Sequence, residues 1–374
     1  RSERGGPVLR LIGPAAASFA LCLLAIFALR PLAIALDLID RPGGRKTHHG
    51  DVPIVGGLAM FMGIVLGIGL LPLGEAAGAS FLAACTILVT IGLVDDRFDL
   101  SPWTRLPGQV AASIVLIVGA GAVVTTLGAP FGNGELVLSG LGAVLFTVLI
   151  TMAAINAFNM LDGMDGLAGA MALTSLLAIA LACWLAGAPA LMGPCFVVAG
   201  AIAAFLVFNL PIRLNRPVRC FMGDAGSTLL GFSVAWMCIQ ATQEPVRAIS
   251  PVTALWIVAM PLYELLWSTI RRIVRGVSPF KADSDHFHHL LLKAGFGVRG
   301  AFAVFVALAA FLAAFGLTAS RLGLPDHYSF MLLIAAGVGI VCLMYRADLL
   351  WKLIPDSLRR LPPLEPPAPH KHGA

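Results

Sequence analysis

Three acidic side chains that lie close together in the sequence could bind a metal ion or a phosphate. Asp95, Asp96 and Asp99 follow an apolar stretch, in the segment DDRFD. If that stretch is a helix that continues through the motif, Asp99 lies one turn from the other two, and three carboxylates crowd one end of a cleft. Adjacent carboxylates provide hard oxygen ligands for Mg²⁺, and their mutual repulsion favours uptake of a proton by one of them. The alternative is a solvated loop in which the acids pair with Arg97 and Arg105.

A second motif, NAFNMLDGMDGLAG at residues 156–169, alternates polar and apolar positions at the end of another apolar stretch. Its amides and carboxylates recur at three-residue intervals, at Asn156, Asn159, Asp162 and Asp165. This spacing puts them on one face of a helix. Gly163 and Gly166 let the backbone approach a ligand closely, and the free N–H groups at the start of the next helix can bind a phosphate. Caps and tight turns alone would explain one Asp-Gly pair but hardly four polar residues in register.

A third motif, FMGDAGS at residues 221–227, places an acid between glycines at the start of an apolar stretch. Asp224 could be the N-cap of a helix. The functional interpretation is a metal ligand that lies beside Phe221, whose ring offers a flat face to a nucleobase. The two interpretations remain open at this point.

The histidines of the segment HFHH, His286, His288 and His289, follow a run of basic residues. Three imidazoles within four residues after a basic run indicate a binding site for a polyanion, and a solvated loop is the alternative. Lys46, with its neighbours His48 and His49, forms a weaker second candidate, because membrane orientation alone could account for a basic loop there.

The composition indicates what positions these motifs. Of the 374 residues, 59% are hydrophobic and 12% are charged, and the mean hydropathy is +0.91. Soluble domains have about 45–50% apolar residues, so a soluble globular protein is excluded. Eleven stretches are long enough for a bilayer core of about 30 Å. They lie near residues 11–36, 53–73, 78–94, 109–128, 138–158, 167–187, 189–210, 221–242, 251–272, 301–319 and 329–345.

We therefore predict an all-α polytopic membrane protein with about eleven transmembrane helices. An N-terminal tail (1–10) precedes a single transmembrane catalytic domain (11–345), and a Pro-rich tail (346–374) follows it. The predicted loops of one face hold 19 of the 25 Lys and Arg residues and 14 of the 20 acidic residues. The positive-inside rule puts that face in the cytoplasm, with the N-terminus outside and the C-terminus inside. The net charge of +5 therefore reflects membrane orientation, and we expect no nucleic-acid partner.

The four motifs resemble those of the polyprenyl-phosphate N-acetylhexosamine-1-phosphate transferases, in their order and in the face they share. The resemblance covers roughly residues 37–300 and fits the eleven-helix count. Within that superfamily the chain is similar to the bacterial branch that transfers GlcNAc-1-phosphate (WecA type), through HFHH, RKTHHGDVPIVGG and TQEPVRAISPVTALW. The branch that uses phospho-MurNAc-pentapeptide usually has three consecutive histidines. Phe287 interrupts them here, which argues against that donor and leaves other UDP-N-acetylated sugars open.

The resemblance implies a reaction in which undecaprenyl phosphate attacks the β-phosphate of a UDP-N-acetylhexosamine. The products are undecaprenyl-diphospho-sugar and UMP, in the first membrane step of a cell-surface polysaccharide pathway. Both reactants are anions, and two unit charges 4 Å apart repel by about 4 kcal/mol at an effective dielectric of 20. Positive charge must therefore be built into the site. The resemblance also implies the bacterial cytoplasmic (inner) membrane, an active site on its cytoplasmic face, and a homodimer.

The resemblance assigns roles to individual residues. It implies that Asp224 and Asn159 hold Mg²⁺, for which Mn²⁺ could substitute. Asp95 and Asp96 would position the lipid phosphate, one of them accepting its proton, and Asp162 would hold its loop in shape. The donor would contact the remaining candidates, which are Lys46, Arg105, Asn156, Asp165, Gly166, Phe221, His286, His288 and His289. The uracil would lie on Phe221 and hydrogen bond to Asp165.

Two other classes of membrane protein also carry acidic motifs. Intramembrane prenyltransferases use Asp-rich motifs with Mg²⁺, but they need two, and this sequence has one. A cation-coupled transporter would bind ions at buried carboxylates near the midplane, whereas these acids gather in loops on one face. Release of UMP from a UDP-sugar separates the three classes.

Overall fold

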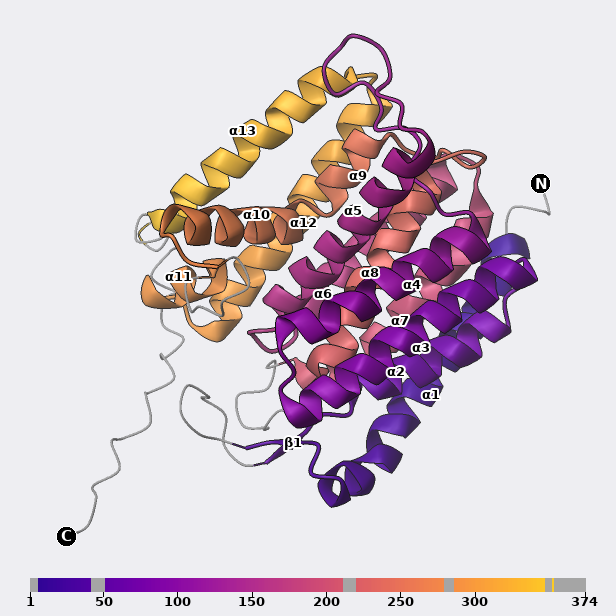
Figure 1. Ribbon diagram of the computed structural model, residues 1–374, viewed down its shortest axis with the longest axis vertical. Coiled ribbons are helices and arrows are strands. Elements are labelled where there is room, and N and C mark those ends of the chain that lie inside the picture. The colour runs from indigo at the N-terminus through magenta and orange to yellow at the C-terminus, as the bar shows by residue number, and fades with distance from the viewer. Residues whose placement is uncertain (1–5, 42–50, 211–219, 279–285, 347–351, 353–374) are drawn as a thin grey trace.

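The computed structural model describes residues 6–41, 51–210, 220–278, 286–346 and 352, which fold as a bundle of helices (Figure 1). A two-stranded antiparallel sheet joins β1 (Ile39–Asp40) to β2 (Val52–Pro53). The helices, in chain order, are α1 (Gly6–Ala35), α2 (Gly56–Gly69), α3 (Glu75–Phe98), α4 (Pro102–Ala120), α5 (Gly140–Leu161), α6 (Leu167–Leu185), the 3₁₀ turn η1 (Pro189–Leu191), α7 (Met192–Asn209), α8 (Gly223–Thr242), α9 (Pro251–Ile257), α10 (Ala259–Val274), α11 (Phe287–Lys293), α12 (Val298–Arg321) and α13 (Asp326–Tyr345).

The helices support the prediction of a multi-pass, helical membrane protein. Each of the eleven predicted apolar stretches overlaps a helix or the pair α9 and α10. Among the described residues, eight helices are long and apolar enough to cross a bilayer, or nine if the bent pair counts as one span. Two of the eleven predicted stretches are not among these nine spans, and they contain α2 and α8. Helix α2 has only 14 residues, about 21 Å at 1.5 Å per residue. Helix α8 has 20 residues, most of them buried, so it need not be apolar enough to face lipid. Eleven spans therefore stay a prediction.

The fourth predicted stretch, 109–128, is displaced from the helix that the structure contains. Helix α4 begins at Pro102, because proline is favoured in the first turn, where its missing N–H is not needed. The helix ends at Ala120, and Gly121 follows it in the left-handed conformation with φ 62°. The apolar residues after Gly121 form a loop instead of a last helical turn.

Helix α8 lies at the centre of the bundle and packs against α2, α3, α5 and α6. The contact with α3 is close enough that a side chain would not fit. A Cβ added to Gly92 would lie 2.3 Å from Cα of Ala225. Small residues allow such close packing between helices in membranes. Here the packing fixes the end of α3 beside the start of α8.

The C-terminal third contains a bent pair of helices. Helices α9 and α10 meet at 82°, so that α10 lies across the bundle with α11 beside it (Figure 1). Glu264, Ser268 and Arg271 of α10 are all buried. At spacings of four and three residues they share one face of the helix. This polar face is unusual for an apolar bundle and belongs to the site described next.

The chain direction brings the motifs together. Helices α3 and α5 end where α6 and α8 begin, so the three acidic motifs and the β1–β2 hairpin share one end of the bundle, called here the site end. The predicted gathering of the motifs on one face is therefore present in the structure.

Candidate active site

The site begins with a contact between the first and third motifs. The backbone N–H of Asp224 donates to Oδ1 of Asp96 at 2.7 Å, and the N–H of Ala225 donates to Oδ2 at 3.3 Å. The first N–H groups of a helix have no partner within it, and a carboxylate there satisfies them. Asp96 of α3 is therefore the acceptor for the start of α8. The alternative that Asp224 is the N-cap is wrong, because Asp224 lies inside the first turn.

Arg105 of α4 links two of the carboxylates. Its NH1 lies 2.6 Å from Oδ2 of Asp95 and 3.3 Å from Oδ1 of Asp224. The other oxygen of Asp95 accepts the N–H of Leu100 at 2.7 Å. Asp95 is only 4% exposed, so it does not lie in a solvated loop, although the pairing with Arg105 that this alternative included is present.

Asp99 does not join the cluster as the spacing predicts. Helix α3 ends at Phe98, and Asp99 follows it, exposed, in the left-handed conformation with φ 51°. Two carboxylates of this motif, rather than three, therefore take part in the contacts around α8.

The second motif contacts the third through Asn159. Its Nδ2 donates to Oδ1 of Asp224 and to Oγ of Ser227, the latter at 3.0 Å. One turn earlier, Nδ2 of Asn156 donates to Oε1 of Gln109 at 2.8 Å. Gln109 of α4 is buried, and its position in an apolar stretch was the signal that could have identified it. The predicted polar face of α5 thus contacts α8 and α4.

Asp162, Asp165 and Gly166 lie in the loop that connects α5 and α6. Desolvation raises the pKa of Asp162 well above its usual value, and the negative charges of Asp224, Asp96 and Asp165 raise it further. Four carboxylates therefore act on one another electrostatically. This excess of negative charge favours a cation at the site end.

The loop is held by a residue that the sequence analysis did not identify. Gly166 adopts φ 74°, and its N–H donates to Oδ1 of Asn209 at 2.5 Å. Nδ2 of Asn209 in turn donates to the carbonyl of Cys220 at 2.9 Å. Asn209 therefore ties the loop before α6 to the segment before α8. Asn209 is the last residue of the apolar helix α7, and apart from its amide side chain nothing in the sequence indicates this role.

The histidines lie beside this loop rather than in solvent. His286 is 9% exposed and His288 is 1% exposed, so the solvated-loop alternative is wrong for both. A Cβ added to Gly163 would lie 2.9 Å from Nε2 of His288. The centroids of the His288 and His289 rings are 4.2 Å apart. The fourth motif thus lies next to the second.

Burial determines the protonation state of His288. Desolvation, together with the neighbouring His289 and His286, lowers the pKa of His288 to about 3. Neither ring nitrogen hydrogen bonds to a residue that the structure describes. A neutral buried imidazole with two unused nitrogens can bind a polar ligand without first breaking an internal contact.

Phe221 is placed by backbone pairing. Its N–H donates to the carbonyl of Pro53 at 3.0 Å, and its carbonyl accepts the N–H of Gly56 at 2.9 Å. Its side chain is half-buried. The β1–β2 hairpin is thereby attached to the start of α8. Lys46 lies outside the described residues, so its predicted role stays a prediction.

The oxygen donors around Asp224 suit Mg²⁺ that is also bound by a substrate. Among the described residues, no three His, Cys, Asp or Glu side chains form a metal-binding group. The side chains of Asp224 and Asn159 are in contact. A 180° rotation of the Asn159 amide group would point its oxygen, instead of its nitrogen, towards the Asp224 carboxylate. Mg²⁺ is commonly held by one or two carboxylates together with substrate phosphates and water. The donor set fits that arrangement and not a closed structural site.

The chain is similar in sequence to proteins of a known family. The model of Glycosyl transferase family 4 matches residues 79–242. The undecaprenyl-phosphate alpha-N-acetylglucosaminyl 1-phosphate transferase of Escherichia coli (strain K12) is 42% identical over 294 residues, which are 79% of this chain and 80% of that protein. The protein of the same name from Yersinia pestis is 40% identical over 297 residues, covering 79% and 81% of the two chains. The one from Haemophilus influenzae is 36% identical over 294 residues, covering 79% and 82%. The chain therefore belongs to glycosyl transferase family 4 and, within it, to the group of these 1-phosphate transferases.

Proposed function

We propose that the protein transfers GlcNAc-1-phosphate from UDP-GlcNAc to undecaprenyl phosphate, giving undecaprenyl-diphospho-GlcNAc and UMP. The reaction would be the first membrane step of a cell-surface polysaccharide pathway. The observation that carries the proposal is the convergence on Asp224 of Asp96, Arg105 and Asn159, from three different helices. The names of the relatives, and their identity over most of the chain, support the choice of substrates.

Metal binding is proposed for Asp224 and Asn159. Mg²⁺, or Mn²⁺ in its place, would neutralise the charge that develops on the diphosphate as UMP leaves. Asp96 supports this role, because it fixes the backbone of Asp224 at the start of α8. The two candidate ligands come from different helices, so their separation depends on the packing of α5 against α8.

The acceptor would bind near the end of α3. Asp95 and Asp96 would position the lipid phosphate, and one of them would accept its proton before the attack. Arg105, which contacts both Asp95 and Asp224, lies between the proposed acceptor and metal positions. Its guanidinium can therefore reduce the repulsion between the two phosphorylated substrates.

The donor would lie between the second and fourth motifs. His286, His288 and His289 would contact the phosphates and orient the sugar, as the closeness of His288 to Gly163 supports. Phe221 would lie against the uracil, and Asp165 would hydrogen bond to its edge. Asn156, Gly166 and Lys46 complete the proposed donor contacts, and Asp162 would keep the loop between α5 and α6 in shape.

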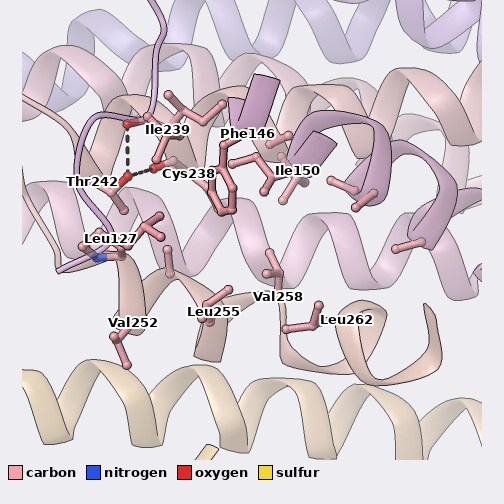
Figure 2. Close-up of a pocket in the computed structure, with 18 of the residues that line it drawn as sticks. Leu127, Phe146, Ile150, Cys238, Ile239, Thr242, Val252, Leu255, Val258 and Leu262 are labelled. Carbon is pink, nitrogen blue, oxygen red and sulfur yellow. Dashed lines mark hydrogen bonds between the residues drawn. The ribbon is translucent and has the colours of Figure 1, made fainter. Parts of the chain in front are cut away.

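An apolar groove offers a place for part of the prenyl chain. The cavity has a volume of about 380 Å³ and is lined by residues of α5, α8, α9 and α10. Figure 2 shows Phe146, Ile150, Cys238 and Ile239 on one side and Val252, Leu255, Val258 and Leu262 on the other. Phe158, which directly precedes Asn159, also lines the groove. The groove therefore approaches the site end only along α5, because its lining on α8 begins at Val234, in the half of that helix far from Asp224. The rest of the chain would stay in lipid, because burying it in protein gains nothing over the bilayer.

The remaining proposals concern location and assembly. The excess of Lys and Arg in the loops predicted for the face that carries the motifs supports a cytoplasmic active site in the inner membrane of a bacterium. Eleven spans, with the N-terminus outside, would be consistent with that orientation. The homodimer rests on the family resemblance, and light scattering of the purified protein tests it.

Release of UMP tests the function. The purified protein is incubated with a panel of UDP-sugars, with and without Mg²⁺ and undecaprenyl phosphate, and the lipid product is identified by mass spectrometry. We expect UMP only when all components are present and the sugar is GlcNAc. Turnover with another UDP-sugar would change the donor and keep the reaction class. Ion flux through proteoliposomes without nucleotide release would favour a transporter instead.

A further inference from the structure

A buried carboxylate that the sequence analysis left without a role contacts the histidine motif. Glu264 of α10 is 0% exposed. Its Oε1 lies 2.7 Å from Nδ1 of His286, and its Oε2 accepts the backbone N–H of Phe287 at 3.1 Å. Both oxygens are therefore used by the first two residues of the HFHH segment. The signal in the sequence was a lone acid within an apolar stretch, which is costly and marks a functional position.

The contact with Glu264 determines which nitrogen of His286 carries hydrogen. A carboxylate that carries no proton only accepts hydrogen bonds, and paired with such a group Nδ1 would be the donor. Nε2 is then the nitrogen that can face a ligand. Oγ of Ser268, one turn further along the polar face of α10, lies 3.4 Å from the same Nδ1. The polar face thus fixes both the tautomer and the orientation of the ring.

The same carboxylate fixes the start of α11. Because Oε2 accepts the N–H of Phe287, the first turn of α11 cannot shift without losing a buried hydrogen bond. The His286 and His288 rings are parallel, with an interplanar angle of 2° and centroids 5.6 Å apart. His288 in turn lies against Gly163. A continuous series of contacts therefore joins α10 to the loop between α5 and α6.

We infer that Glu264 is a positioning residue that orients His286, and through α11 also His288, towards the diphosphate of the nucleotide-sugar donor. The inference rests on the proposed function for the identity of the ligand. The geometry of the Glu264–His286 pair does not depend on that identity. Glu264 itself would not touch the substrate, because it is fully buried.

The substitution Glu264→Gln tests the inference, because it keeps the size of the side chain and replaces one acceptor oxygen by a donor. We expect the KM for UDP-GlcNAc to rise about tenfold or more, and the KM for undecaprenyl phosphate to change less than twofold.

The matched control is Tyr263→Phe, on the neighbouring residue of α10. It removes a buried hydrogen bond of 2.6 Å from the Tyr263 hydroxyl to the carbonyl of Leu333, away from α11. The control should keep both KM values, and an equal rise in the donor KM there would overturn the inference.

A double variant separates positioning from a general loss of structure. If Glu264 acts through His286 and α11, adding Glu264→Gln to His286→Ala should raise the donor KM by clearly less than Glu264→Gln does in the wild type, because only the contribution through His288 remains. Losses that simply multiply would show that Glu264 acts independently, and would overturn the inference.

The histidine tautomer gives a readout that does not depend on turnover. Nitrogen NMR of ¹⁵N-histidine-labelled protein in detergent, with the His286 signal identified by its absence in His286→Ala, should show hydrogen on Nδ1 in the wild type. The Glu264→Gln variant should lose that preference. Wild-type protein with hydrogen only on Nε2 of His286 would overturn the inference, even in an active enzyme. The expected tautomer together with an absence of UMP release would overturn the proposed function and keep the Glu264–His286 pair.

Discussion

The carboxylate of Asp96 accepts the backbone N–H of Asp224 at 2.7 Å, across 128 residues of sequence. The acid motif at the end of α3 and the acid motif at the start of α8 are therefore one structural unit. A Cβ at Gly223 would lie 2.4 Å from Oδ2 of Asp96, so the glycine is part of the same arrangement. Any shift of Asp96 moves the proposed metal ligand.

Replacing Asp96 should affect both stability and turnover. Asp96→Ala removes the acceptor for two N–H groups at the start of α8, which costs about 1–2 kcal/mol of folding free energy for a lost helix cap. It also lets Asp224 move, and a displacement of about 1 Å near the chemistry can lower the rate roughly 10²-fold. Thermal unfolding in detergent and UMP release measure the two effects.

Asp99→Asn is the matched control for Asp96. Asp99 lies three residues further on, is exposed, and adopts a left-handed conformation that Asn also tolerates. The Asp99→Asn variant should keep wild-type stability and activity. A loss of activity in Asp99→Asn as large as in Asp96→Ala would contradict the separation of the two roles.

Removing the charge of Asp224 should abolish metal-dependent activity. Asp224→Asn keeps the size of the side chain and leaves the start of α8 intact, because the backbone N–H of residue 224 still donates to Asp96. We expect a folded protein with UMP release reduced about 10²-fold or more, since the ligand charge acts where negative charge develops. Chelation with EDTA should abolish wild-type turnover, and Mg²⁺ or Mn²⁺ should restore it. Normal, Mg²⁺-stimulated turnover by the variant would exclude the metal role.

The spacing of polar residues predicted which side chains share one face of a helix, but not which residues of other helices they contact. The three-residue interval from Asn156 to Asn159 put both amides on one face of α5, and the structure contains that face. The partner of Asp96 could not be predicted, because it is a backbone N–H more than a hundred residues away. Nor could the pairing of Glu264 with His286, which requires the 82° bend between α9 and α10.

Helix ends were predicted less well than helices, for a local reason. The apolar run at 109–128 does not reveal that Gly121 adopts a positive φ and stops α4. In the same way, the carboxylates of DDRFD do not reveal that α3 ends before Asp99. In both places the conformation of one residue decides whether the next turn is helical, and apolar patterning does not report it.

The buried neutral state of His288 should make stability depend on pH. The pKa of His288 is lowered to about 3, whereas an unfolded histidine has a pKa of about 6.5. Below pH 6.5 the unfolded chain binds a proton that the folded chain does not, so folding is weakened as the pH falls. His288→Gln removes this effect. Between pH 7 and pH 5 its free energy of unfolding should fall by about 2 kcal/mol less than that of the wild type.

Unfolding of both proteins in detergent at several pH values measures this difference. His327→Gln is the control, because it removes a half-exposed histidine at the other end of the bundle. The control should follow the wild type across the range. Parallel curves for His288→Gln and the wild type would show that His288 is not held neutral by burial.

Filling the apolar groove should weaken use of the long lipid acceptor without affecting the donor. Ala153 of α5 lines the cavity of about 380 Å³, and Ala153→Phe would place a ring inside it. If the prenyl chain lies there, the KM for undecaprenyl phosphate should rise about tenfold, equivalent to ~1.4 kcal/mol of binding. The KM for UDP-GlcNAc should stay unchanged. A short prenyl phosphate that does not extend into the groove should be used equally by the variant and the wild type.

Leu149→Phe is the matched control, because Leu149 lies one turn earlier on α5, is 63% exposed and does not line the cavity. Since it adds an aromatic ring to the same helix outside the groove, it should retain wild-type kinetics with all three substrates. If Ala153→Phe also behaves like the wild type with undecaprenyl phosphate, the chain must leave the site end by another path between the helices.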